Sequence, residues 1–163
     1  MRTRKGLAIV VVMFSLVCGL GVSRVSAART VLTAQDYIDI QQLYARYAMT
    51  IDSGDAEGWA NTFTPDGVFN NSSRGHDALV QFVHDWRDKR SGAERRHWNS
   101  NLIITPTEDG VAGSVYLLLL DIGVRPPVPN MSAVYEDHLV KTAQGWRFKT
   151  RVLHSDPGKK ASQ

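Results

Sequence analysis

The sequence predicts one α+β domain, a cone-shaped barrel in which a strongly bent antiparallel sheet and three N-terminal helices enclose an apolar pocket. Two observations predict this class. Apolar residues recur every three or four positions in the first half of the chain, whereas the second half contains four extended segments divided by turn signals. Helices followed by a meander of strands indicate a segregated α+β fold, and a curved sheet crossed by a long helix encloses a cavity.

Three helices are expected before the sheet. Thr33 and Asp36 have the spacing of a capping box, which predicts a long amphipathic helix over residues 34–51. Asp55 is placed to cap a short second helix that carries Trp59, and a third helix ends near Lys89.

Four strands are expected to form the meander, over residues 95–105, 111–122, 131–142 and 145–153. In the last strand apolar and basic residues alternate, which predicts one buried and one solvated face. The residues expected inside are Trp146, Phe148 and Val152, and those expected in water are Arg147, Lys149 and Arg151.

Residues 1–27 contain, in order, the three regions of a secretory signal peptide. A basic start is followed by an apolar run of 14 residues from Leu7 to Leu20 and then by Val25-Ser-Ala27. The run is shorter than the roughly 20 residues that cross a bilayer, so we expect cleavage, export to the periplasm or the medium, and no membrane contact afterwards. A lipid anchor on Cys18 is the alternative. The folded domain is expected over residues 28–155, and residues 156–163 are expected to form a flexible tail.

Cleavage changes the charge of the chain. The signal carries four of the 19 basic residues and none of the 16 acidic ones, so the formal charge of +3 belongs to the targeting segment. Nucleic acid is therefore not an expected partner. The one cysteine, Cys18, leaves with the signal, which excludes a cysteine nucleophile or a thiolate metal site, and the histidines have no metal-ligand spacing.

Asp52 and His97 are the first candidates for chemistry. His97, Asn99 and Asn101 alternate onto one face of a strand, and Asp52 follows the first helix where Asp55 is better placed to cap the next. A carboxylate that accepts from one imidazole nitrogen fixes the tautomer and makes the other nitrogen a base. Both residues are also compatible with structural roles, in which His97 is a satisfied core histidine and Asp52 turns the chain.

Three further residues are candidates for proton transfer or oxyanion stabilisation. Asp121 ends a strand and is either a second acid or base or a solvated carboxylate. Tyr47 and Tyr116 carry phenols that can donate to an oxygen gaining charge, although aromatic residues at these periods are commonly core residues.

Several segments resemble the SnoaL-like branch of the nuclear transport factor 2-like superfamily, in order and spacing, over nearly all of the exported chain. They are Ile40-Gln-Gln-Leu-Tyr-Ala-Arg-Tyr47, Asp52-Ser-Gly-Asp55, Trp59, Phe63 to Phe69, Arg96-His-Trp-Asn-Ser-Asn101, Tyr135 to Val140, and Gly145 to Lys149. This branch includes scytalone dehydratase, bile-acid dehydratases and polyketide cyclases. Asp52 and His97 match its catalytic dyad, and Tyr47 and Asp121 resemble accessory residues. Ile51 departs from scytalone dehydratase, which has a tyrosine at that place.

The resemblance implies a cofactor-free lyase or isomerase that removes a proton from a small apolar ring compound. Asn101 and Tyr116 are also expected to contact the substrate, together with a lining of Phe63, Phe69, Val83, Trp86, Trp98 and Trp146. It implies homo-oligomers formed through the open face of the sheet. The alternative is a non-catalytic module with the same fold that binds a small molecule or serves in assembly.

Overall fold

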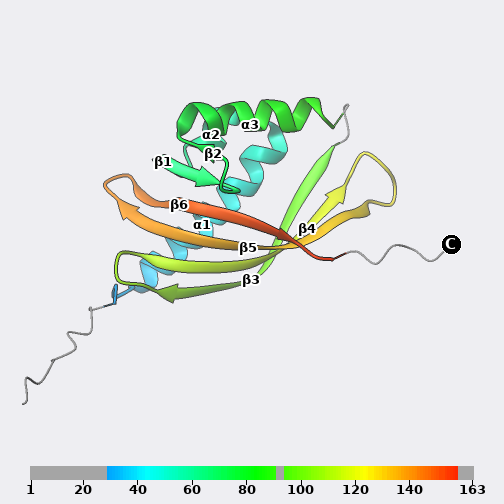
Figure 1. Cartoon of the computed structure of the whole chain (residues 1–163). Helices are drawn as coiled ribbons and strands as arrows, with labels where there is room; N and C mark the ends of the chain where they lie inside the picture. The colour runs from blue at the N-terminus through cyan, green and yellow to red at the C-terminus, as the bar shows by residue number, and fades with distance from the viewer. Residues whose placement is uncertain (1–28, 91–93, 158–163) are drawn as a thin grey trace, which may run out of the picture.

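The computed structural model describes residues 29–90 and 94–157. The expected signal peptide and residues 158–163 of the expected tail lie outside them. The described chain forms three helices and six strands in an α+β arrangement, with α1 crossing one face of the sheet (Figure 1). Within these ranges no helix is long and apolar enough to cross a membrane.

Helix α1 (Ala34–Ser53) begins at the predicted capping box. The Thr33 hydroxyl accepts from the Asp36 backbone N–H at 3.2 Å, and the Asp36 carboxylate accepts from the Thr33 backbone N–H at 2.9 Å. Asp36 is buried and also accepts from Trp146 Nε1 at 2.9 Å and from Lys141 Nζ at 2.7 Å. The start of α1 is thereby joined to the last two strands of the sheet.

Two shorter helices follow. Helix α2 (Ala56–Ala60) has Asp55 as its N-cap, as predicted, with the carboxylate accepting from the Gly58 N–H at 2.8 Å. Helix α3 (His76–Asp88) buries Leu79 and Val83 and packs on α2 and β1.

The sheet has six strands in the order β2-β1-β6-β5-β4-β3. The predicted antiparallel meander is present as β3 (Arg95–Pro106), β4 (Val111–Asp121), β5 (Val128–Thr142) and β6 (Gly145–Ser155). Strand β1 (Phe63–Phe69) pairs in parallel with β6, and β2 (Ser73–Arg74) pairs with β1.

The predicted barrel is wrong, because the sheet is mixed and is neither strongly curled nor closed. Strand β1 adds to the β6 side, so β2 and β3 form the two edges of an open sheet. The antiparallel pattern of the four later segments contained no sign of this parallel addition. Strand β3, which carries His97, is thus an edge strand of the sheet.

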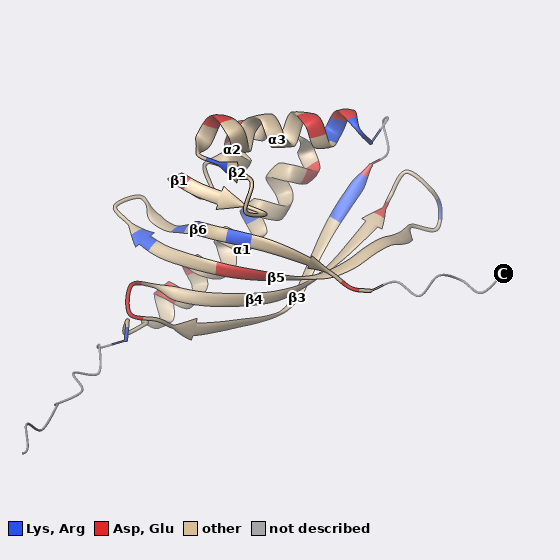
Figure 2. Cartoon of the chain, viewed as in Figure 1, with Lys and Arg blue, Asp and Glu red and all other residues tan. Residues whose placement is uncertain are grey.

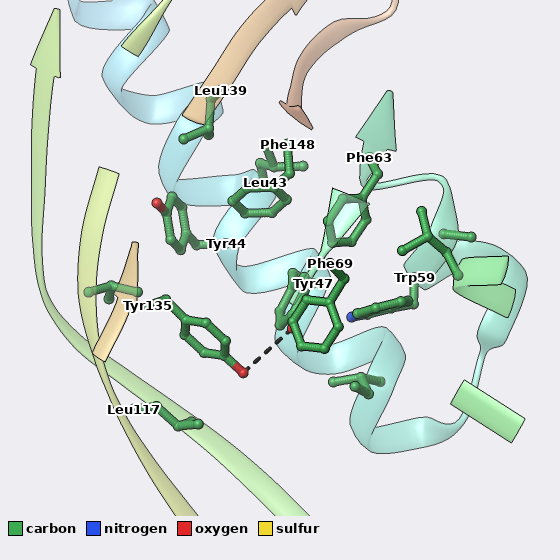
Figure 3. Close-up of a cluster of buried hydrophobic side chains, with 14 of the residues drawn as sticks. Leu43, Tyr44, Tyr47, Trp59, Phe63, Phe69, Leu117, Tyr135, Leu139 and Phe148 are labelled. Carbon is green, nitrogen blue, oxygen red and sulfur yellow. Dashed lines mark hydrogen bonds between the residues drawn. The ribbon is translucent and has the colours of Figure 1, made fainter. Parts of the chain in front are cut away.

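The core between α1 and the sheet is largely aromatic (Figure 3). Tyr47 of α1 contacts Trp59, Phe63, Tyr135 and Phe148 with ring centroids 5.4 to 6.2 Å apart. The contacts with Tyr135 and Phe148 are edge-to-face, an arrangement that the charge distribution of aromatic rings favours.

Arg151 lies at the centre of this core and is fully buried. Its Cζ atom is 3.7 Å from the ring centroid of Tyr135 and 4.1 Å from that of Tyr47, and its guanidinium is 3.2 Å from the Asp137 carboxylate. The Tyr44 hydroxyl donates to the same carboxylate at 2.5 Å. Burial disfavours the charge of Arg151, but Asp137 and the tyrosines outweigh burial and raise its pKa.

The prediction that Arg151 faces water is wrong. In the pairing of β5 with β6, Leu139 is opposite Phe148 and His138 is opposite Thr150, so Lys149 is an extra residue that forms a bulge. The bulge reverses the alternation, and Arg151 turns onto the buried face.

Replacing Asp36 by alanine is expected to lower the free energy of unfolding by about 2–4 kcal/mol. The change removes the carboxylate half of the capping box, with Thr33 still the N-cap, and leaves the Trp146 indole N–H buried without its acceptor. Lys141, Thr33 and Trp146 hold the pKa of Asp36 well below its usual range. The stabilisation is therefore present above about pH 4 and is lost as the pH falls further. Urea unfolding at pH 7 and pH 3 checks this, with Asp39→Ala on the same helix as the control. Equal effects of the two substitutions would contradict it.

Candidate functional site

The structure brings Asp52 and His97 into direct contact. The Asp52 Oδ1 atom is 2.6 Å from His97 Nδ1, and the same carboxylate accepts from the His97 backbone N–H at 3.1 Å. A carboxylate can only accept, so Nδ1 carries the proton of this hydrogen bond, and in the neutral imidazole the lone pair is then on Nε2. Within residues 29–90 and 94–157 no side chain hydrogen-bonds to Nε2.

Asp52 is positioned by the end of α1. Gly54 adopts a left-handed conformation with φ of +75°, which ends the helix one turn after the buried Ile51. Arg87 of α3 donates to the Ser53 carbonyl at 2.8 Å. The end of α1 therefore places the Asp52 carboxylate, and the contact from α3 holds that end in position.

His97 is positioned by β3. It lies opposite Leu119 of β4, on the sheet face that meets α1, and its side chain is 4% exposed. The Trp86 ring of α3 packs at 5.6 Å from the imidazole. The imidazole is therefore held between the carboxylate and an indole.

A cavity of about 670 Å³ opens at the dyad, between the end of α1 and the start of β3. Asp52 and His97 lie in its wall with Ala48 and Met49. Four arginines also line it, which the sequence reasoning did not anticipate; they are Arg87, Arg90, Arg95 and Arg96. In Figure 2 the basic end of α3 and the basic start of β3 lie at the same end of the molecule.

A second hollow of about 690 Å³ runs between α1 and the edge strand β3. It shares His97, Ala48 and Met49 with the first cavity, so the two meet at the dyad. Its wall is mostly apolar, but the Asn99 amide lies in it with both polar atoms buried and unpartnered among the described residues. Asn99 is on the face of His97, two residues along the strand.

Trp86, Trp98 and Asn101 lie near the dyad. Trp86 contacts His97, and Trp98 and Asn101 line the groove beside α1. Asn101 does not share the face of His97 as its spacing predicted. The pairing of β3 with β4 shifts between Ser100 and Ile103, and Asn101 takes a φ of +58° at this bulge.

Tyr47 and Asp121 occupy other environments. The Tyr47 hydroxyl is buried, 3.5 Å from that of Tyr135, and burial raises its pKa well above the usual value. Asp121 forms an ion pair with Arg95, which lowers the pKa of the carboxyl, and accepts from the Gly123 N–H. Neither residue lines the two cavities that contain His97.

The remaining expected lining residues do not face these two cavities. Four of them are buried in the core, where their side chains pack the helices against the sheet; they are Phe63, Phe69, Val83 and Trp146. Tyr116 points to the opposite, open face of the sheet and is 53% exposed. Among the described residues no three His, Asp or Glu side chains gather into a metal site.

Replacing Gly54 by alanine is expected to lower the free energy of unfolding by about 1–2 kcal/mol, because alanine is strained at this φ. The added Cβ also overlaps the Arg87 guanidinium that holds the end of α1. Thermal unfolding of Gly54→Ala beside Gly145→Ala, which is strained without such a contact, separates the two causes. An unchanged melting temperature for Gly54→Ala would contradict the account of this helix end.

Comparison with curated proteins finds no significant match. Solved structures do match. Rv3472 of Mycobacterium tuberculosis, a protein of unknown function solved as an Asp-to-Asn variant, is 30% identical over 75% of this chain and 72% of its own, with a TM-score of 0.66. A Catenulispora acidiphila protein in complex with S-DNPA is 30% identical over 76% of this chain and 95% of its own, with a TM-score of 0.68.

ActVI-ORFA of Streptomyces coelicolor is 25% identical over 77% of this chain and 98% of its own, with a TM-score of 0.69. The model of the SnoaL-like domain matches residues 32–152, which include α1, all of the sheet except the end of β6, and both dyad residues. The chain belongs to the SnoaL-like domain family, and its fold is the nuclear transport factor 2-like fold.

Proposed function

We propose that this chain is a cofactor-free lyase or isomerase in which His97 removes a proton from carbon and Asp52 orients and stabilises His97. The observation that carries the proposal is the 2.6 Å contact between Asp52 Oδ1 and His97 Nδ1 at the wall of a cavity. The fold is shared with polyketide cyclases and dehydratases, which agrees with this class of chemistry.

The proton transfer follows from the tautomer. Asp52 accepts from Nδ1–H, so the Nε2 lone pair takes the proton and the resulting imidazolium is stabilised by the carboxylate. The electron pair left on carbon moves towards an adjacent activating group. In elimination of water the C–O bond at the next carbon breaks and the imidazolium gives its proton to the departing hydroxyl, whereas in elimination of halide the proton passes to solvent. In isomerisation the imidazolium returns the proton to another carbon.

Asn99 is the proposed donor to the oxygen that gains charge. Its buried amide has no partner among the described residues and lies on the His97 face of β3. Tyr47 and Tyr116, the donors expected from the sequence, lie in the core and on the open sheet face.

Export and assembly complete the proposal. Residues 1–27 are removed as a signal peptide, so the enzyme acts outside the cytoplasm. Copies associate through the open face of the sheet, where Ile103 and Tyr116 are more than half exposed.

The test is a search for transformed compounds in deuterated buffer. Purified protein is incubated with extracts of small organic compounds, and mass spectrometry follows both new products and deuterium incorporated into the compounds that bind. Native protein is expected to do both, whereas His97→Ala binds and does neither. If the native protein and His97→Ala bind the same compound and neither changes or labels it, the chain is a binding module.

A further inference from the structure

The cavity at the dyad carries more positive than negative charge. Four arginines line it against two carboxylates, those of Asp52 and Glu94. Asp52 is already engaged by His97. A cavity with this balance favours an anionic ligand over a neutral one.

Two of the four arginines have protein partners. Arg87 donates to the Ser53 carbonyl at 2.8 Å, and Arg95 forms an ion pair with Asp121. These contacts hold the ends of α1 and β3 in place. Arg87 and Arg95 are therefore parts of the scaffold around the cavity.

Arg90 is different. Its guanidinium lies 3.8 Å from the Trp86 ring centroid, and its Nε and Nη1 atoms are buried with no hydrogen-bond partner within the described ranges. Burial, together with the guanidinium groups of Arg87 and Arg95, lowers the pKa of Arg90. An oxyanion at this position relieves both the missing hydrogen bonds and the repulsion.

The position of Arg90 relates it to the base. Trp86 contacts both the Arg90 guanidinium, at 3.8 Å, and the His97 imidazole, with ring centroids 5.6 Å apart. The apolar groove between α1 and β3 begins at His97 and is lined by Met49, Trp98 and Leu102. His97 thus lies between a cationic cavity and an apolar groove.

We propose that the site takes an amphiphilic organic anion, with its carboxylate or phosphate on Arg90 and its apolar body in the groove between α1 and β3. This inference rests on the proposed function in placing the reacting carbon at His97 Nε2. It changes the expected substrate from a purely apolar ring compound to one that carries an oxyanion, because the Nε and Nη1 N–H groups of Arg90 are donors that have no acceptor among the described residues.

Calorimetric titration with three naphthalene probes tests the inference. The probes are 2-naphthoate, 2-naphthyl phosphate and the uncharged 2-naphthamide. One or both anions are expected to bind at least tenfold more tightly than the amide, with an advantage that falls at high salt. Arg90→Gln is expected to weaken binding of the preferred anion about tenfold, the loss of one charge-assisted hydrogen bond, and to leave the amide unchanged. Arg74→Gln, an exposed site on β2, makes the same charge change away from the cavity and is expected to change neither.

The inference is overturned if the amide binds as tightly as both anions, if no probe binds, or if Arg90→Gln and Arg74→Gln have equal effects. Thermal unfolding of both variants shows whether each is folded. Binding is measured without turnover, so it is independent of the proposed catalysis. His97→Ala is expected to retain the anion preference, and a protein that binds anions but transforms no compound would separate failure of the proposed function from failure of this inference.

Discussion

Asp52→Asn is expected to lower the turnover of the protein's substrate by about 100-fold to 10,000-fold while changing its dissociation constant little. Asparagine has nearly the shape of aspartate, so the cavity is preserved. It has no charge to stabilise the imidazolium, and its amide can donate to His97 Nδ1 and so place the imidazole proton on Nε2. His97 then has no free lone pair towards the cavity.

His97→Ala is expected to have an effect of similar size, and the double variant Asp52→Asn/His97→Ala is expected to lose little more. Residues that act as one unit show this lack of additivity. Steady-state kinetics of the three variants measure it, and Asp55→Asn, which changes the cap of α2, is the matched control. If the loss of turnover in the double variant equals the product of the losses in the two single variants, Asp52 and His97 act separately.

Asp137→Asn is expected to lower the free energy of unfolding by about 3–5 kcal/mol, a large part of the 5–15 kcal/mol that typical domains possess. The substitution keeps the shape of the side chain and an acceptor for the Tyr44 hydroxyl. It removes the only carboxylate that the described residues place against the buried Arg151 guanidinium. The charge then remains in the core with aromatic rings alone around it.

A double-mutant cycle identifies the cause. Arg151→Met together with Asp137→Asn removes both charges. The double substitution is therefore expected to lower the free energy of unfolding by less than the sum of the decreases caused by the two single substitutions. Urea unfolding monitored by tryptophan fluorescence measures all four proteins. If Asp137→Asn costs less than about 1 kcal/mol, the buried ion pair does not hold this core together.

Local signals in the sequence predicted the helices and the meander well. The Thr33 and Asp36 capping box, the Asp55 cap and the turns between strands each depend on a few neighbouring residues, and each is present in the structure. The contact of Asp52 with His97 has no such local signal. The residue types made the pair a candidate and resemblance to a family strengthened it, but 45 residues separate the two positions, so no local pattern predicts their contact.

Two bulges explain most of what the sequence did not predict. Alternation places Asn101 with His97 and Arg151 in water, and each assignment fails because an extra residue shifts the strand before it reaches that position. Neither bulge has a glycine or proline that would announce it. The strand pairing across the sheet determines them, and this pairing is not readable from one segment.

The residues that line the cavity are also not predictable from the sequence. Buried aromatic residues such as Phe63 and Phe69 have the same spacing whether they pack in a core or surround a ligand, and here they pack in the core. The arginines around the dyad come from the end of α3, from Arg90 just after it and from the first residues of β3, which are far from Asp52 in sequence. Their common location appears only when the fold brings these elements together.

The protonation state of His97 tests the central claim most directly. Nitrogen-15 NMR of histidine-labelled protein at pH 8, with His97→Ala to assign the resonances, reports which ring nitrogen carries the proton. The account predicts a protonated Nδ1 and an unprotonated Nε2, and it predicts that Asp52→Asn disturbs this pattern. A proton on Nε2 in the native protein, or a pattern that Asp52→Asn leaves unchanged, would contradict the assignment of His97 as the base and Asp52 as the residue that orients it.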